Sequence, residues 1–319
     1  MTDPGQGIFE FTGTGAGLSG ITYVSGNDFR AVSDSGGGAR LYPLTIALDL
    51  AAGTIESASL GSPLRLATGS DHEGVAYSAS RGTVFVSDED DDPAGSFIRE
   101  FSLGNGALVT TLSIPPVLLN DRPGLGFESL SLGAGALWTT TEQALAQESD
   151  TASGTEGTLI RLQRFDASSL AAAGQFAYLT EPANSAHDLL ALPDGNLLVL
   201  ERGPASGGTR NRIFLVDFAG ATDTSALADL DAGGFTAVSK TLLFERNMGS
   251  RNFEGLALGP LRALQSYSVV LIADNGSGTQ QALYPLIIHG VVPEPSATAL
   301  LALAALGCVT RRRPPFRAA

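Results

Sequence analysis

The chain has 319 residues and a formal net charge of −14, with 33 acidic residues against 19 Lys and Arg. This balance argues against a nucleic-acid surface, because phosphate backbones are bound by clustered Lys and Arg, although a divalent metal would still allow a phosphate substrate. The single cysteine, Cys308, excludes an internal disulfide, and the apolar content is that of a globular protein with a large core.

Five similar hairpins follow one another along the chain. Each has a short apolar strand, a turn that contains Gly or Asp, and a second strand that ends in an acid. Successive copies are about 54 to 67 residues apart, which is close to the period of propeller blades. The hairpins begin at Gly17, Asp71, Gly126, Ser185 and Asn252.

The rest of each repeat also has strand character. An apolar segment that alternates with polar residues, such as residues 39–50, follows each hairpin, and a fourth strand usually comes next. After the fifth hairpin no fourth strand remains, so we expect residues 6–13 to complete the last blade and to close the ring. The predicted fold is therefore an all-β propeller of four-stranded blades over residues 1–290.

Acidic residues recur at two points of these hairpins. They lie at the start of the first strand (Glu73, Glu128, Asp188, Glu254) and at the end of the second (Asp34, Asp88, Glu89, Glu142, Glu201, Asp274). The first hairpin has Ser19 instead, and the fourth has His187-Asp188. Closure into a ring would bring these groups to one mouth of the channel.

A ring of carboxylates is an oxygen-rich site of the kind that binds Ca²⁺. Calcium is therefore the expected metal, with eight predicted ligands. The alternative is structural, with the acids accepting hydrogen bonds from turn amides or pairing with Arg202 and Arg251. The predicted ligands are Glu73, Asp88, Glu128, Glu142, Asp188, Glu201, Glu254 and Asp274.

Two of the three histidines lie beside these acids. His72 and His187 are candidates for a general acid or base, and ordinary hydrogen bonding in a loop is the alternative for each. His289 lies in an expected outer strand and is interpreted as structural. No two histidines have the spacing of a zinc site, and the lack of a G-x-S-x-G motif argues against a serine α/β-hydrolase.

The units HEGVAY…VFVSDED, GFESLSL…LWTTTEQ and NFEGLALG…VLIADN resemble the phytase-like family, also called esterase-like activity of phytase. The resemblance covers residues 17–290, and it implies a β-propeller that hydrolyses phosphoric or other esters with calcium as the metal. Ser19 and His187-Asp188 depart from the motif. The positions that match it are Glu73, Glu128 and Glu254 in first strands and Asp88, Glu142 and Asp274 in second strands.

Three functional classes are compatible with this resemblance. In a calcium-dependent ester or phosphoester hydrolase, the mouth acids would hold the ion, and Arg202 or Arg251 would clamp a phosphoryl oxygen. The alternatives are a non-catalytic surface propeller that binds polysaccharide or protein of the extracellular matrix, and a lactonase-like hydrolase that also uses a metal. We expect a monomer in each case.

The last residues, 291–319, form a separate segment. Pro293-Glu294-Pro295 precede an apolar run over 297–309, and Arg311-Arg312-Arg313 follow it. This order resembles the PEP-CTERM sorting signal of Gram-negative bacteria, which an exosortase processes. The run is short for a membrane span of about 20 residues unless its flanks extend it, and it lacks the polar face of a docked amphipathic helix.

The signal implies an exported protein of the cell surface or extracellular space, which a short transmembrane helix holds in the inner membrane only before cleavage. Export also requires a signal peptide, but Met1 to Phe9 contain neither a basic nor an apolar region. We therefore expect either a miscalled start, with residues missing upstream, or a truncated gene. An upstream segment would leave room for a sixth blade.

Overall fold

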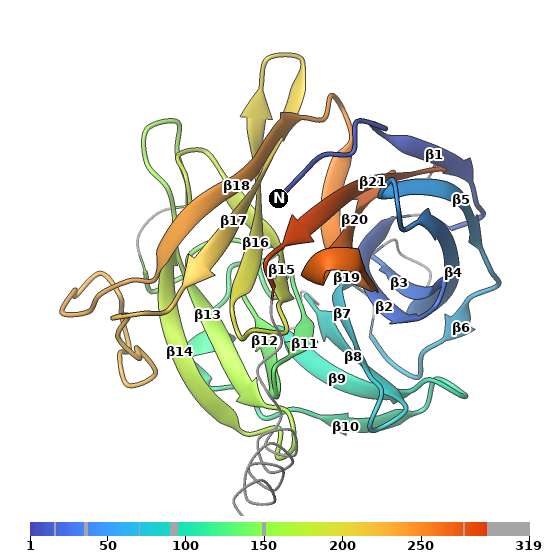
Figure 1. The fold of residues 1–319 in the computed structure, drawn as a ribbon. Helices are drawn as coiled ribbons and strands as arrows, with labels where there is room; N and C mark the ends of the chain where they lie inside the picture. The colour runs from blue at the N-terminus through green and yellow to red at the C-terminus, as the bar shows by residue number, and fades with distance from the viewer. Residues whose placement is uncertain are drawn as a thin grey trace, which may run out of the picture.

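The computed structural model describes residues 1–15, 17–34, 38–69, 71–89, 95–148, 151–276 and 278–291. These residues form five sheets around a common axis (Figure 1). Two short 3₁₀ helices, Pro116–Leu119 and Ala263–Gln265, are present, and no α-helix occurs in the described ranges. The predicted all-β propeller of four-stranded blades is confirmed, and its ring closes with five blades.

The blades are numbered along the chain, and each is given from its innermost strand outwards. Blade 1 contains β2 (Leu18–Ser25), β3 (Asp28–Ser33), β4 (Arg40–Asp49) and β5 (Thr54–Leu60), with β6 (Leu64–Arg65) also paired to β4. Blade 2 contains β7 (His72–Ser78), β8 (Thr83–Asp88), β9 (Phe97–Ser102) and β10 (Leu108–Thr111). Blade 3 contains β11 (Ser131–Gly133), β12 (Ala136–Thr139), β13 (Leu159–Asp166) and β14 (Ala172–Leu179).

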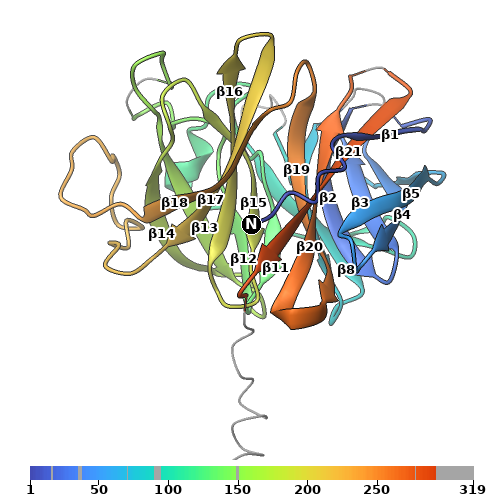
Figure 2. The ribbon, with the colours of Figure 1, turned by 45° about the horizontal axis from the view of Figure 1, so that its top comes forward.

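Blade 4 contains β15 (Ser185–Ala191), β16 (Leu197–Ala205), β17 (Gly208–Asp217) and β18 (Ser239–Asn247). Blade 5 contains β19 (Asn252–Arg262), β20 (Ser266–Asp274), β21 (Gln280–His289) and β1 (Phe9–Thr12). The N-terminal strand therefore belongs to the same sheet as the last three strands. It pairs antiparallel with β21, from Phe9 opposite Leu283 to Thr12 opposite Gln280 (Figure 2). The predicted closure is confirmed, and it leaves β21 without an open edge.

The core consists of apolar clusters between neighbouring blades. Phe85 of β8 packs with Leu137 of β12, for example, and Leu198 of β16 packs in one cluster with Leu271 of β20. Similar clusters join the remaining neighbouring blades. Because a second strand is covered on both faces, its middle is mainly apolar, and β8 is buried along its whole length although it also contains Thr83, Ser87 and Asp88. The packing thus fixes the blades around the axis.

Glycines allow the innermost strands to approach one another closely. A Cβ atom at Gly74 of β7 would lie 2.3 Å from the backbone nitrogen of Leu130 in blade 3. A Cβ atom at Gly20 would lie 2.2 Å from the carbonyl oxygen of Glu73. A Cβ atom at Gly255 would lie 2.4 Å from the carbonyl oxygen of Ser19. The Gly of the repeated Glu-Gly pair is therefore a packing requirement at the axis.

Gly74→Ala is expected to destabilise the fold by about 3 kcal/mol or more, because the added methyl group would meet the backbone of the next blade. Thermal unfolding measures this change, which corresponds to a fall in Tm of at least about 5 °C. Gly154→Ala is the matched control, because no atom lies within 4 Å of a Cβ built there. Equal Tm values for the two variants would contradict the close packing.

The C-terminal sorting helix and the apolar run over 297–309 lie outside the described residues. The last strand, β21, ends at His289, next to the boundary predicted between residues 290 and 291. Within the part of the chain that the structure describes, no helix is long and apolar enough to cross a membrane.

Candidate metal centre at the channel mouth

Every innermost strand carries one extra residue near its start. In blade 2, residues 72–75 oppose residues 86–88, and in blade 4 residues 186–188 oppose Glu201 and Leu200. In blades 1, 3 and 5 the innermost strand also has one residue more than the second strand at this position. Such a bulge bends the strand and redirects a side chain. The side chains in this position, called the inner ring, are Ser19, Glu73, Glu128, His187 and Glu254.

A second set of side chains comes from the ends of the second strands. In blade 2 the backbone N–H of Glu89 donates to the carbonyl of Asp71, at 2.9 Å, two residues before the inner-ring Glu73. The equivalent residue of each other blade pairs with the backbone two residues before its own inner-ring residue. These positions, called the rim, are Asp34, Glu89, Glu142, Arg202 and Asp274.

Direct contacts between blades show that these side chains converge. The hydroxyl of Ser19 donates to the carboxylate of Glu73 in blade 2. Arg202 of blade 4 donates from Nη1 to Oε1 of Glu254 in blade 5 at 2.5 Å. Glu89 of blade 2 accepts the backbone N–H of Gly126 in blade 3. Residues far apart in the sequence therefore meet around one axis.

Burial and mutual repulsion act together on these acids. Glu128 is 8% exposed, and its pKa is raised well above the usual range by burial and by the charges of Glu73, Glu142 and Glu89. Burial is also the main reason why the pKa of Glu73 is raised, against the opposing hydrogen bond from Ser19. Burial raises the pKa of Glu89 to about 8. Groups of this kind are stabilised by protons or by a bound cation.

Burial also raises the pKa values of the neighbouring acids. Burial and the nearby Asp274 and Glu254 raise the pKa of Asp34 to about 7. The pKa values of Glu142 and Glu254 are also raised, again chiefly by burial, although Arg202 opposes the shift at both. The mouth is thus a strongly acidic site with one arginine inside it.

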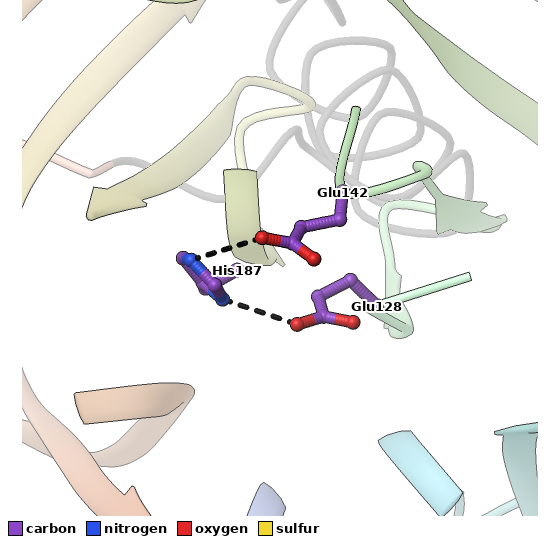
Figure 3. Close-up of side chains that lie close together, drawn as sticks. All are labelled: Glu128, Glu142 and His187. Atoms are coloured by element: carbon purple, nitrogen blue, oxygen red, sulfur yellow. Dashed lines mark hydrogen bonds and ion pairs between the residues drawn. The ribbon is translucent and has the colours of Figure 1, made fainter. Parts of the chain in front are cut away.

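Two groups of side chains have the compactness of a metal site. Asp71, Glu73 and Glu89 in blade 2 each offer a carboxylate oxygen, and these atoms lie within 4.8 Å of one another. Glu128, Glu142 and His187 at the junction of blades 3 and 4 offer donor atoms within the same distance (Figure 3). The first group is entirely oxygen and suits Ca²⁺, whereas the second includes an imidazole.

Two residues predicted from the sequence lie inside blade 2. Asp88 is fully buried and accepts a hydrogen bond from Arg99 of β9. His72 is also fully buried, with Nε2 3.6 Å from Oδ2 of Asp88. Because side chains alternate along a strand, the next residue, Glu89, occupies the rim instead.

Glu201 and Asp188 also lie between blades. Glu201 accepts hydrogen bonds from the hydroxyl of Tyr178 at 2.7 Å and from Lys240 Nζ at 2.6 Å, and both partners lie outside the two rings. Asp188 occupies the place that a glycine has in blades 1, 2 and 5. Its carboxylate accepts the backbone N–H of Leu256 in blade 5 at 2.5 Å, so it joins two blades at the axis.

The other predicted residues divide between the mouth and the periphery. Arg202 and Asp274 are at the rim, and Glu73, Glu128 and Glu254 are in the inner ring. Arg251 instead pairs with Glu10 of β1 at the outer part of blade 5. His289, at the end of β21, lies 3.1 Å from the hydroxyl of Thr2.

Three residues of the compact groups were not predicted as ligands: His187, which was predicted as a general acid or base, and Glu89 and Asp71. Glu89 is among the strand-end acids but follows Asp88 directly, and nothing in the sequence shows which of the two reaches the channel. Asp71 stands two residues before Glu73, and the corresponding residue of the other blades is not an acid. The recurrence of the hairpin, which places residues two before the inner ring next to the rim, was the available signal.

The model of one protein family matches residues 14–276 and is described as Phytase-like, esterase-like activity of phytase. The chain belongs to the phytase-like family. The matched region contains the inner ring and the rim of all five blades, so the acidic mouth is part of the phytase-like propeller. No protein of curated function matches the chain.

A second match concerns the end of the chain. Residues 291–313 match the PEP-CTERM protein-sorting motif, as the sequence predicted. The phytase-like propeller thus carries a signal that indicates export and membrane-associated sorting and that implies processing by exosortase-type machinery.

Solved structures similar to the phytase-like propeller have low sequence identity. Hydrazine synthase of Kuenenia stuttgartiensis is 11% identical, with 81% of this chain and 77% of that chain covered and a TM-score of 0.37. A member of the duf4221 family from Bacteroides vulgatus is 6% identical (89% and 98% covered, TM-score 0.41). A protein from Lactobacillus plantarum is 14% identical (87% and 86% covered, TM-score 0.38). No functional conclusion follows from these likenesses.

Proposed function

We propose that the phytase-like propeller is an exported, calcium-dependent hydrolase of phosphoric or other esters that acts at the channel mouth. The observation that carries this proposal is the all-oxygen group of Asp71, Glu73 and Glu89, whose donor atoms lie within 4.8 Å of one another. The family resemblance supports the reaction class, and the PEP-CTERM motif supports export.

The donor set fits Ca²⁺. The ion prefers six to eight oxygen ligands, and carboxylates supply them together with backbone carbonyls and water. Glu73 and Glu89 are 7% and 9% exposed, so both are held close to the axis by the surrounding blades. When bound there, the ion would neutralise a phosphate and lower the pKa of a coordinated water.

The chain's own residues would bind and orient the ester. The guanidinium of Arg202 lies at the rim with Nη1 on Glu254, and its planar fork matches two oxygens of a phosphoryl or carboxyl group. The inner-ring side chains are buried, so they would limit the access of bulk water to an ester held there.

Hydrolysis of p-nitrophenyl phosphate, p-nitrophenyl acetate and a small lactone tests this proposal, with Ca²⁺ or with EDTA. We expect turnover of at least one ester with Ca²⁺ and its loss with EDTA. Arg202→Ala should lower kcat/KM by about 100-fold, because the clamp on the developing charge is lost.

Arg251→Ala is the matched control, because Arg251 pairs with Glu10 at the periphery, and its kcat/KM should equal that of the wild type. Turnover that survives EDTA would contradict the proposed mechanism. Calcium binding without turnover of any substrate would contradict hydrolysis and favour a propeller that only binds polysaccharide or protein. Turnover of the lactone alone would favour the lactonase-like alternative.

A further inference from the structure

His187 lies between two carboxylates from the neighbouring blade. Its Nδ1 is 3.1 Å from Oε1 of Glu128, and its Nε2 is 3.6 Å from Oε1 of Glu142. The imidazole is 4% exposed and the two carboxylates come from blade 3, so the three side chains form a compact group at one blade junction (Figure 3). Both nitrogens of one buried ring thus face acids.

The two distances imply different interactions. The 3.1 Å contact is a hydrogen bond, and an Nδ1–H that donates to Glu128 leaves the lone pair of Nε2 facing Glu142. The 3.6 Å separation is too long for a hydrogen bond. It is close to the separation of about 3.0–3.4 Å between two ligand atoms that each lie about 2.1 Å from one ion. The pair is therefore spaced for a shared cation.

The chemistry of the donors selects the kind of ion. Calcium and magnesium take oxygen ligands, whereas imidazole nitrogen suits Zn²⁺, Mn²⁺, Fe²⁺ and Co²⁺. A carboxylate that accepts the other N–H of a ligating histidine orients the ring and strengthens its binding. Glu128 is such a carboxylate, because it accepts the hydrogen bond from Nδ1 of His187. The Asp71–Glu73–Glu89 group has no nitrogen donor, so the two groups differ in the ions they favour.

We propose that His187 and Glu142 bind a first-row transition metal ion at the junction of blades 3 and 4, with Glu128 orienting His187. This centre is separate from the calcium site of blade 2 and does not depend on the proposed hydrolysis. With two protein ligands it has open positions for water or for an oxygen of a substrate. The mouth would then hold two metal ions of different chemistry.

Titration of the tag-free, metal-stripped full chain with Co²⁺ in the presence of excess Ca²⁺ tests this centre. We expect one equivalent of Co²⁺ per chain, with a visible absorption spectrum that excess Ca²⁺ does not remove. His187→Gln should weaken Co²⁺ binding by at least about 100-fold, and Glu128→Gln by about 10-fold or more. His289→Gln is the matched control, because it removes an imidazole at the end of β21, beside Thr2 and away from the mouth, and it should leave Co²⁺ binding unchanged.

A second readout needs no variant. Mn²⁺ bound to the wild-type chain should show coupling to a histidine nitrogen in pulsed electron paramagnetic resonance. Displacement of Co²⁺ by Ca²⁺, unchanged binding in His187→Gln, or the lack of nitrogen coupling would each overturn the proposal. A failure of Ca²⁺ binding with intact Co²⁺ binding would instead contradict the calcium site alone, so the two proposals fail separately.

Discussion

The metal-free protein is expected to lose stability as the pH rises from about 4 to about 8. Unfolded Asp and Glu lose their protons near pH 4, whereas the folded mouth keeps several of them, because burial and repulsion raise the pKa of Glu89 to about 8 and of Asp34 to about 7. Between these pH values the folded state binds more protons than the unfolded state. The free energy of unfolding therefore falls with increasing pH.

One buried group acts in the opposite direction. The pKa of His187 is lowered well below its usual value by burial and by Arg202, so its contribution to stability is lost as the pH falls below about 6.5. Several mouth carboxylates have raised pKa values, so their combined effect on stability exceeds that of this single imidazole. Calorimetry in EDTA should therefore show a net fall in Tm of at least about 5 °C between pH 5 and pH 9.

Glu128→Gln provides the matched test. The variant removes one buried charge but keeps the shape of the side chain and an oxygen that accepts from His187. We expect it to raise the Tm of the metal-free protein at pH 8 by about 2–6 °C, and to have little effect near pH 4, where the glutamate is protonated anyway. Glu56→Gln, on the exposed side of β5, should leave Tm unchanged. A loss of stability in Glu128→Gln at pH 8 would contradict the proposed repulsion.

Bound calcium should offset the loss of stability at high pH. An ion bound by Asp71, Glu73 and Glu89 displaces protons and offsets their repulsion, so millimolar Ca²⁺ is expected to raise Tm more at pH 8 than at pH 5. At about 1,000 times the Kd, the stabilisation of the folded state is about 4 kcal/mol. Calorimetric titration in buffers of different ionisation enthalpy should also detect the released protons.

Glu89→Gln separates the two roles of this acid. The variant should be more stable than the wild type without metal at pH 8, and it should lose most of the Ca²⁺-dependent rise in Tm. Glu56→Gln again serves as the control and should respond to Ca²⁺ like the wild type. Full stabilisation of Glu89→Gln by Ca²⁺ would place the ion away from blade 2.

The repeats were sufficient to predict the propeller. Each hairpin combines a short strand, a turn and a second strand that is mainly apolar, and these features follow from packing between two neighbouring blades. The closure by β1 was predictable because the fifth repeat lacked its fourth strand, while residues 6–13 had no other place. These features depend on composition and spacing, which a sequence shows directly.

Which residues lie at the mouth was harder to predict from the sequence. The bulge in each innermost strand adds one residue, and a shift of one residue moves a side chain to the other face of a strand. His187 therefore takes the inner-ring position, and Asp188 takes the place of a packing glycine. At the end of β8, where side chains alternate between the two faces, Glu89 reaches the channel and Asp88 pairs with Arg99 inside blade 2. Spacing alone does not reveal a bulge.

Partners across blades were also hidden in the sequence. Glu201 looks like the other strand-end acids, but Tyr178 and Lys240 surround it in the folded protein. Arg202, the next residue, instead lies at the rim beside Glu254. Which acid has a cation or a hydroxyl nearby depends on contacts between segments that are distant in sequence.

Anomalous diffraction from crystals grown with Ca²⁺ would show directly where the protein binds the ion. We expect an ion at the channel mouth, about 2.3–2.6 Å from carboxylate oxygens of Asp71, Glu73 and Glu89. An ion bound only at the periphery, or an acidic mouth that holds no calcium at millimolar concentration, would contradict this expectation.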